Sequence, residues 1–280
     1  MTMFLKGFTD GIKVEVKAAV EEQKRSWKGF ILILLGLAII LALFSLLGYI
    51  ESSASRDKFN ESRTRANAVT SYWILAKAKS TVGSATAYQL VTTYSQGNYH
   101  RMDNIMQDQY DQNISETRIY IIHQGTFFCT NSLNRWVCLA EENLTNDNDK
   151  LMVRLAGKAA TGKDTVDAIT SKLVNSGVIS FNGGPKKTTI LGRTCNEVSY
   201  DIQLHRINES DLEYLGSLFV ISSLTDKASV TSCLDEESGL TLYIRINAMT
   251  PKKSDISVEV ETVGIGFGNE LPESVFELPD

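Results

Sequence analysis

The hydrophobic residues of this chain form one long uninterrupted run and, after it, a series of short alternating runs. Residues 29–50 contain no charged side chain. This run exceeds the roughly 20 residues that a helix needs to cross the ~30 Å hydrocarbon core of a bilayer. Because helices buried in a protein core rarely extend so far without a polar face, the pattern predicts one transmembrane helix over residues 29–50.

The residues that flank this run predict its orientation. Lys24 and Lys28 precede it, whereas Glu51 follows it and the next basic residue is Arg56. Basic residues tend to remain on the cytoplasmic side, although their numbers over a wider window are nearly balanced. A cleaved signal peptide is the alternative, but its apolar part is normally only ~7–15 residues long. We therefore expect an uncleaved signal anchor in the cell membrane, single-pass, with residues 1–28 cytoplasmic and the C-terminal domain extracytoplasmic.

The pattern changes twice after the apolar run. Residues 51–83 lack proline and are rich in Ala, Lys and Arg, which predicts a helix that either continues the membrane helix as a stalk or packs on the domain that follows. From residue 84 onward, apolar and polar residues alternate in short runs separated by turn residues, as is typical of antiparallel strands. The sequence Gln96-Gly97-Asn98 predicts a hairpin. Between residues 148 and 175 the apolar spacing becomes three and four, which predicts two helical pieces.

No repeat or linker interrupts residues 84–280, so this segment is expected to be one β-rich domain. Its last residues, 270–280, contain two prolines and are expected to form an extended tail over the sheet. Further strands are expected, after the helical pieces, at residues 186–204, 214–224, 227–235, 239–249 and 255–267.

All four cysteines follow the apolar run, and an even number in one domain suits an oxidising compartment. Cys129 and Cys138 lie on two predicted strands joined by a short polar loop, so a local disulfide is expected. Cys195 and Cys233 are then left to pair. Four cysteines allow three pairings, so this choice is a hypothesis, and four buried free thiols in a cytosolic domain are the alternative.

Four Asn-x-Ser/Thr sequons also follow the apolar run, and they are candidate glycosylation sites. Their number is only modestly above chance expectation. They lie at Asn60, Asn113, Asn143 and Asn208.

Charge and motifs argue against several kinds of function. The net charge of −5 disfavours a nucleic-acid partner, which requires a basic surface. Residues 157–164 nearly match a phosphate-binding loop, but Asp164 stands where a Mg²⁺-binding hydroxyl is needed. His100, His123 and His205 are scattered and lack the spacing of metal ligands. We therefore expect no catalytic residues, no cofactor and no metal site.

Three short motifs resemble those of LolA/LolB-like lipoprotein carriers, and in particular of their membrane-anchored archaeal relatives with paired cysteines. Ile190–Arg193 leads into a strand, Gly239–Leu242 opens a later strand, and Phe276–Pro279 ends the chain. The resemblance covers residues 84–280 and implies an α+β fold, in which a curved antiparallel half-barrel packs on helices and leaves an apolar cavity for acyl chains. The transmembrane helix departs from the family and argues against a freely diffusing carrier.

These expectations combine into a membrane-tethered extracytoplasmic module that binds lipid, lipoprotein or another apolar ligand in the cell envelope. The same alternation also builds an ordinary core, so a structural surface subunit without a ligand is the alternative. Lys28-Gly29 before an apolar helix resembles an archaeal type IV pilin cleaved after Gly29, and residues 1–28 could contact an envelope assembly component. The expected partners are the bilayer, a lipid or lipoprotein, and an envelope protein or a second copy of the chain.

Overall fold

The computed structural model describes residues 53–110, 112–132, 135–182, 184–215, 217–250, 255–268 and 271–279. The cytoplasmic segment expected at residues 1–28 and the transmembrane helix expected at residues 29–50 lie outside the described residues. Among the helices that are described, none combines the length and the apolar composition needed to cross a membrane.

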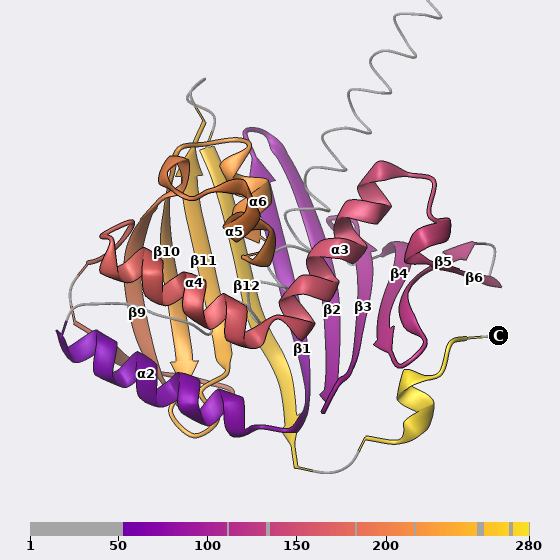
Figure 1. Ribbon diagram of the computed structural model, residues 1–280, viewed down its shortest axis with the longest axis horizontal. Coiled ribbons are helices and arrows are strands. Elements are labelled where there is room, and N and C mark those ends of the chain that lie inside the picture. The colour runs from indigo at the N-terminus through magenta and orange to yellow at the C-terminus, as the bar shows by residue number, and fades with distance from the viewer. Residues whose placement is uncertain are drawn as a thin grey trace, which may run out of the picture.

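Twelve antiparallel strands form one sheet in the described part of the chain. In chain order they are β1 (Ser71–Val82), β2 (Ala85–Gln96), β3 (Tyr99–Gln107), β4 (Asn113–Ile122), β5 (Gly125–Ser132), β6 (Arg135–Ala140), β7 (Ile179–Phe181), β8 (Lys186–Ile190), β9 (Arg193–Gln203), β10 (Lys227–Asp235), β11 (Thr241–Met249) and β12 (Asp255–Phe267). Their order in the sheet is β6-β5-β4-β3-β2-β1-β12-β11-β10-β9-β7, with β8 paired to β9. The sheet is curved and open (Figure 1), and the expected antiparallel sheet is confirmed.

The expected helical stalk over residues 51–83 is wrong in its second half. Helix α2 (Ser53–Ala68) ends three residues before β1, which lies in the middle of the sheet between β2 and β12. Along β1 the buried residues follow every second position from Tyr72 to Ser80. Pairing on both sides of the strand therefore outweighs the helix-forming composition of this segment, since tertiary contacts override intrinsic propensity.

Four further helices cover one face of the sheet (Figure 1). They are α3 (Asp147–Thr161), α4 (Lys163–Asn175), α5 (Glu209–Tyr214) and α6 (Ser217–Ser222). We call the covered face of the sheet the inner face and the opposite one the outer face. The two helical pieces expected between residues 148 and 175 are confirmed as α3 and α4.

The strand expected at residues 214–224 is wrong, because this segment contains the end of α5 and all of α6. Leu215, Leu218 and Ile221 recur at every third residue, and each is at most 1% exposed. This spacing places all three on one side of a helical turn, where they pack into the core. The short segment has the apolar content of a strand, and only its periodicity distinguishes the two structures.

The core lies between the inner face and the helices, and it is closely filled across the centre of the sheet. Val258 and Val260 of β12, and Ile244 and Ile246 of β11, are completely buried. They belong to one continuous hydrophobic cluster with residues of α3 to α6. The helices therefore act as the second layer of an ordinary two-layer α+β domain.

Two disulfides join the cysteines in the expected pairing. Cys129 of β5 and Cys138 of β6 are directly opposite each other, with Cα atoms 4.0 Å apart. Cys195 of β9 and Cys233 of β10 have Cα atoms 5.5 Å apart. Each bond therefore connects two neighbouring strands.

The described C-terminal residues, 271–279, lie against the outer face, and we call them the tail. They contain a single helical turn, η3 (Glu273–Phe276), which lies beside β3 (Figure 1). Phe276 is buried, and its ring centroid is 5.8 Å from that of Tyr99. The tail thus covers the sheet as expected, although part of it is helical rather than extended.

Candidate functional site

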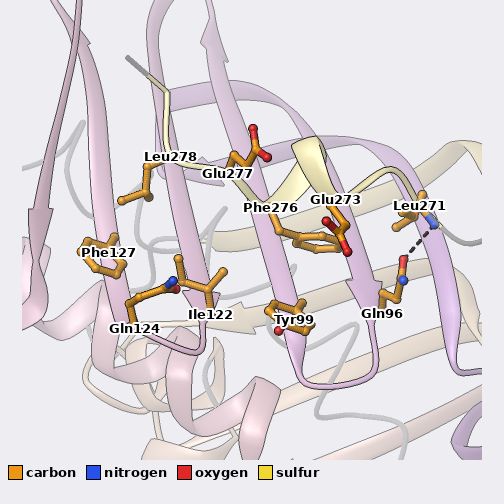
Figure 2. A pocket seen from close by; sticks show the side chains of 10 residues that line it. All are labelled: Gln96, Tyr99, Ile122, Gln124, Phe127, Leu271, Glu273, Phe276, Glu277 and Leu278. Carbon is orange, nitrogen blue, oxygen red and sulfur yellow. Dashed lines mark hydrogen bonds between the residues drawn. The ribbon is translucent and has the colours of Figure 1, made fainter.

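A groove lies between the tail and the outer face at one end of β2 to β5 (Figure 2). Its volume is about 600 Å³, which is within the usual ~300–1,000 Å³ of small-molecule sites. We call it the tail groove. It is lined by Gln96, Tyr99, Ile122, Gln124, Phe127, Leu271, Glu273, Phe276, Glu277 and Leu278.

Strand alternation explains why the sheet contributes these side chains. In β3, Met102 and Asn104 are buried on the inner face, so Tyr99 and Arg101 point to the outer face. Tyr99 is opposite Gln96 of β2, and the two side chains of such a pair share one face. The groove therefore begins where the hairpin turn of β2 and β3 places these two residues beneath the tail.

The lining is amphipathic. Tyr99, Ile122 and Phe127 of the sheet lie across the groove from Phe276 and Leu278 of the tail (Figure 2). Figure 2 also shows the carboxylates of Glu273 and Glu277 on the tail side, and both of these residues are exposed. An apolar floor below a polar rim suits a ligand with an apolar body and a polar end.

Arg101 holds the tail against the sheet. Its Nη1 donates a hydrogen bond to the carbonyl oxygen of Val275, 2.9 Å away, and its Nε donates to Asp103 Oδ1 at 2.7 Å. Its guanidinium lies 5.3 Å from the ring of Tyr94 and 5.4 Å from that of Tyr120, which are cation–π distances. Burial acts to lower the pKa of Arg101, but Asp103 outweighs it and raises the pKa above its usual value, so the anchor stays charged.

A second hydrogen bond fixes the start of the tail. The backbone N–H of Leu271 donates to Oε1 of Gln96 at 2.7 Å (Figure 2). Together with the Arg101 bond, it ties both ends of the helical turn to the sheet. The position of the groove wall is therefore set by two side chains of β2 and β3.

Two openings lie between α3 and the inner face, and the larger one, of about 730 Å³, is at the end of α3, lined in part by Ser95, His100 and Thr161. The smaller one, an apolar crevice, has a volume of about 20 Å³ and is lined in part by Met102, Ile119 and the small side chains of Ala156 and Ala160. Such a space holds about one water molecule. The resemblance to lipoprotein carriers implies an acyl-chain cavity on this side of the sheet, whereas packed side chains fill most of this space here. The larger opening at the end of α3 is lined mainly by polar side chains and turn residues, so the tail groove is the better site for an apolar ligand.

The candidate glycosylation sites lie apart from the groove lining. Asn113 and Asn143 are exposed, at the start of β4 and at the end of the short helix η1 (Glu141–Asn143). Asn208 is exposed and caps α5 by accepting a hydrogen bond from the N–H of Asp211 at 2.8 Å. Asn60 lies within α2. Their modification stays a prediction.

The three histidines have separate surroundings. His100 Nδ1 is 3.1 Å from the hydroxyl of Ser95, and the ring of His123 is edge-on to Tyr99 at 4.9 Å. His205 lies in the short helix η2 (Leu204–Arg206). In the part of the chain that the structure describes, no three His, Cys, Asp or Glu residues are grouped to hold a metal ion.

The sequence predicted a tail on the sheet but did not locate the groove. The relevant signal is the spacing of Leu271, Phe276 and Leu278 in the tail, which is neither helical nor strand-like. The strand residues of the groove look like any other alternating positions. Only the register of β2 to β5 brings them together with the tail.

No protein-family model matches this sequence, and no curated protein does either. Several solved structures align with this chain at low identity and low TM-score. MucB aligns over 81% of this chain with 11% identity and a TM-score of 0.42, and the chain spans only 64% of MucB. The lipoprotein LppX of Mycobacterium tuberculosis aligns over 74% of this chain and 91% of its own, with 8% identity and a TM-score of 0.39.

A LolA superfamily protein of Nitrosomonas europaea aligns over 81% of this chain and 99% of its own, with 10% identity and a TM-score of 0.31. Lipoprotein-carrier-like folds are therefore among the structures similar to this chain. Their TM-scores are too low to assign the chain to any of these families. Its function has to be argued from the tail groove itself.

Proposed function

We propose that this domain is a non-catalytic, extracytoplasmic module that binds the apolar part of a lipid or lipoprotein in the tail groove. The observation that supports it is an amphipathic groove of about 600 Å³, in which apolar side chains from two distant segments of the chain lie across from each other. Burial of an acyl chain against these walls would provide the binding free energy, at about 25 cal/mol per Å² of apolar surface removed from water.

The rim of the groove constrains the head group of the ligand. Glu273 and Glu277 are exposed beside the apolar wall, and they repel an anionic group placed at the same position. A neutral or cationic head group facing solvent, with the acyl chain inside, suits this distribution. A ligand that carries several phosphates fits it poorly.

We infer the cellular setting from the two disulfides and from the apolar run of residues 29–50. Two disulfides within one domain support an oxidising compartment. The uncharged run at residues 29–50 supports a single membrane anchor. In this setting the domain would present its groove to lipids close to the membrane surface, rather than carry them through solution.

Photocrosslinking with a neutral palmitate ester of glycerol that carries a diazirine group on its acyl chain tests both the binding and its location. The full-length protein is labelled in lipid nanodiscs, and the labelled peptides are mapped by mass spectrometry. We expect labels within residues 96–99, 122–127 and 271–279, from both sides of the groove. Labels confined to other residues would contradict the proposal.

A matched pair of isoleucines on β4 provides the control. Ile122 lines the groove, whereas Ile114, on the same strand, is 64% exposed and outside it. Ile122→Gln removes an apolar contact worth about 1.5–3 kcal/mol, so labelling should fall by roughly tenfold or more. Ile114→Gln should leave it unchanged. Equal labelling of the two variants would exclude the groove as the site.

A structural subunit without a ligand is the second candidate function. The closely filled inner face favours it, because β11 and β12 have completely buried side chains beneath the helices. A protein of this kind should show no saturable labelling by the palmitate probe and no lipid in an organic extract of the purified protein. Saturable labelling of the tail groove would exclude it.

A further inference from the structure

Strand β6 is at one end of the sheet and has a partner on one side only. It pairs with β5, and among the described residues no strand pairs with its other side. Figure 1 shows β6 at the end of the sheet that is opposite β9. Natural proteins usually protect such an edge with a proline, a bulge or an inward-pointing charge, and the sequence RWVCLA of β6 has no proline.

The separation of the Cα atoms of Cys129 and Cys138 indicates which backbone groups face this open edge. The Cα atoms of Cys129 and Cys138 are 4.0 Å apart, which is the short separation of a pair without direct backbone hydrogen bonds. In an antiparallel sheet, the N–H and C=O groups of such a residue point away from its partner strand. The backbone groups of Cys138, and of Trp136 and Ala140 two residues away, are therefore directed toward the open edge.

The side chains on one face of β6 are unusually apolar for an exposed position. Val137 is 52% exposed and Leu139 is 41% exposed. Arg135, two residues before Val137, is also exposed, and Glu141 directly follows the strand. Neither Arg135 nor Glu141 forms an ion pair with another described residue. Arg135, Val137 and Leu139 thus alternate along the strand, and Glu141 follows them as the first residue of η1.

We propose that β6 is a self-association site, at which a second copy of this chain adds its own β6 antiparallel to the first. A two-fold axis beside Cys138 would place Arg135 opposite Glu141 of the other copy. The same register places Val137 opposite Leu139. Both copies would use the same residues, as an isologous interface requires.

The backbone supports this register. Hydrogen-bonded pairs would form between the two Cys138 residues and between Trp136 and Ala140 of opposite copies. These are the residues whose N–H and C=O groups already face the open edge. Val137 and Leu139 would then be in the closer, non-hydrogen-bonded pairs, where side-chain contacts are strongest. Arg135 and Glu141 would meet at the two ends of this ladder.

The distribution of charge favours a second copy over an unrelated strand. In the antiparallel arrangement, Arg135 of each copy lies against Glu141 of the other copy. In a parallel arrangement, Arg135 would instead lie against Arg135 of the other copy. One strand pair buries less surface than the roughly 1,200–2,000 Å² of a stable complex. The dimer should therefore be weak and depend on concentration, as suits a protein held at high local density.

Sedimentation equilibrium of the full-length protein in density-matched detergent tests the proposal. We expect a reversible monomer–dimer equilibrium. Arg135→Glu should weaken it at least tenfold, because like charges would then be opposed. The swapped double variant Arg135→Glu/Glu141→Arg should restore dimerisation close to that of the unchanged protein. Lys186→Glu, at an exposed base on β8, is the matched control and should have no effect.

Three results would overturn the proposal. One is a protein that stays monomeric up to the highest concentration reached. Another is a dimer that Arg135→Glu does not weaken. The third is a double variant that remains as weak as the single one, since a loss of folding or a partner other than this chain would not be repaired by exchanging the two charges.

Discussion

At the scale of single residues, the best-defined polar contact is a buried ion pair beside the turn between β10 and β11. The carboxylate of Asp235 is fully buried and accepts two hydrogen bonds from the guanidinium of Arg193, at 3.0 and 2.8 Å. The N–H and hydroxyl of Ser238 donate to the same carboxylate at 2.8 and 2.6 Å. The buried carboxylate of Asp235 therefore accepts four hydrogen bonds, which compensate for its removal from water.

The pH dependence of stability should show this contact. Burial acts to raise the pKa of Asp235, but the hydrogen bonds from Arg193 and Ser238 outweigh it and lower the pKa below its usual value. A carboxyl with a lowered pKa contributes stability above its unfolded pKa of about 3.9 and loses it as the pH falls through the folded value. Asp235 should thus stabilise the fold at neutral pH and no longer do so in strong acid.

Asp235→Asn tests this expectation. At about pH 7 the variant should lose about 2 kcal/mol of unfolding free energy, because it removes the buried charge that accepts these hydrogen bonds. Arg193 keeps the exposed Glu237 as a second partner, at 2.7 Å. The difference from the unchanged protein should shrink as the pH is lowered to about 2. Urea unfolding across this range measures it, and a difference independent of pH would contradict the assignment.

Two glycines allow neighbouring groups to approach more closely than any other residue would permit. A Cβ on Gly266 would lie 2.2 Å from Nε1 of Trp73, on the neighbouring strand β1. A Cβ on Gly239 would lie 1.6 Å from the carbonyl oxygen of Ser62, and Gly239 has a φ of +74°. The first glycine makes room for an aromatic ring on the outer face, and the second lets α2 pack on the β10–β11 turn.

At the scale of elements, local patterns predict the hairpins, the long helices and most strands, including the interior strands β11 and β12, but they miss β1. The turn at Gly97, where φ is +57°, and the helices α3 and α4 follow directly from turn chemistry and apolar spacing. The strand β1 does not, because its Ala and Lys residues favour a helix and only its two neighbours in the sheet make it a strand. The short α6 is predicted as a strand because its apolar content is typical of one, although Leu215, Leu218 and Ile221 recur with a helical spacing.

The two disulfides should differ in their contribution to stability. Cys195 and Cys233 are 38 residues apart, whereas Cys129 and Cys138 are 9 apart. In the chain-entropy model the longer loop gives about 4 kcal/mol and the shorter about 3 kcal/mol. Replacing Cys195 and Cys233 with alanine should thus lower the unfolding free energy by about 1 kcal/mol more than replacing Cys129 and Cys138.

Guanidinium unfolding of the two double variants, each with the other disulfide intact, measures this difference. The oxidised and unchanged protein is the reference, and the midpoint and slope are compared together. A larger loss from the Cys129/Cys138 variant would show that the local bond matters through the packing of β5 and β6, rather than through loop closure.

At the scale of the whole molecule, the two faces of the sheet have different roles. The inner face meets the helices and is closely filled, while the outer face is covered only in part, by the tail. The sequence predicts both layers from apolar periodicity. It does not predict which face holds a groove, because that depends on the curvature of twelve strands and on where the tail crosses them.

Removal of the tail tests whether the outer face binds a ligand, and it leaves the packing of the inner face unchanged. A chain that ends at Gly268 keeps all twelve strands and loses the burial of Phe276 and the hydrogen bond from Arg101 to Val275. The cost should be about 3 kcal/mol, which leaves a domain with two intact disulfides folded. Labelling by the palmitate probe should fall at least tenfold, because one wall of the groove is gone.

The matched control for this truncation is the full-length double variant Glu273→Gln/Glu277→Gln, which keeps the apolar wall and removes only the charges of the rim. It should retain labelling by the palmitate probe, because the head group of the probe is neutral and the apolar wall is unchanged. Circular dichroism and urea unfolding establish that both variants are folded. If the truncated chain bound palmitate as well as the full-length chain, the ligand would have to lie outside the groove, with the crevice beneath α3 opening to admit it.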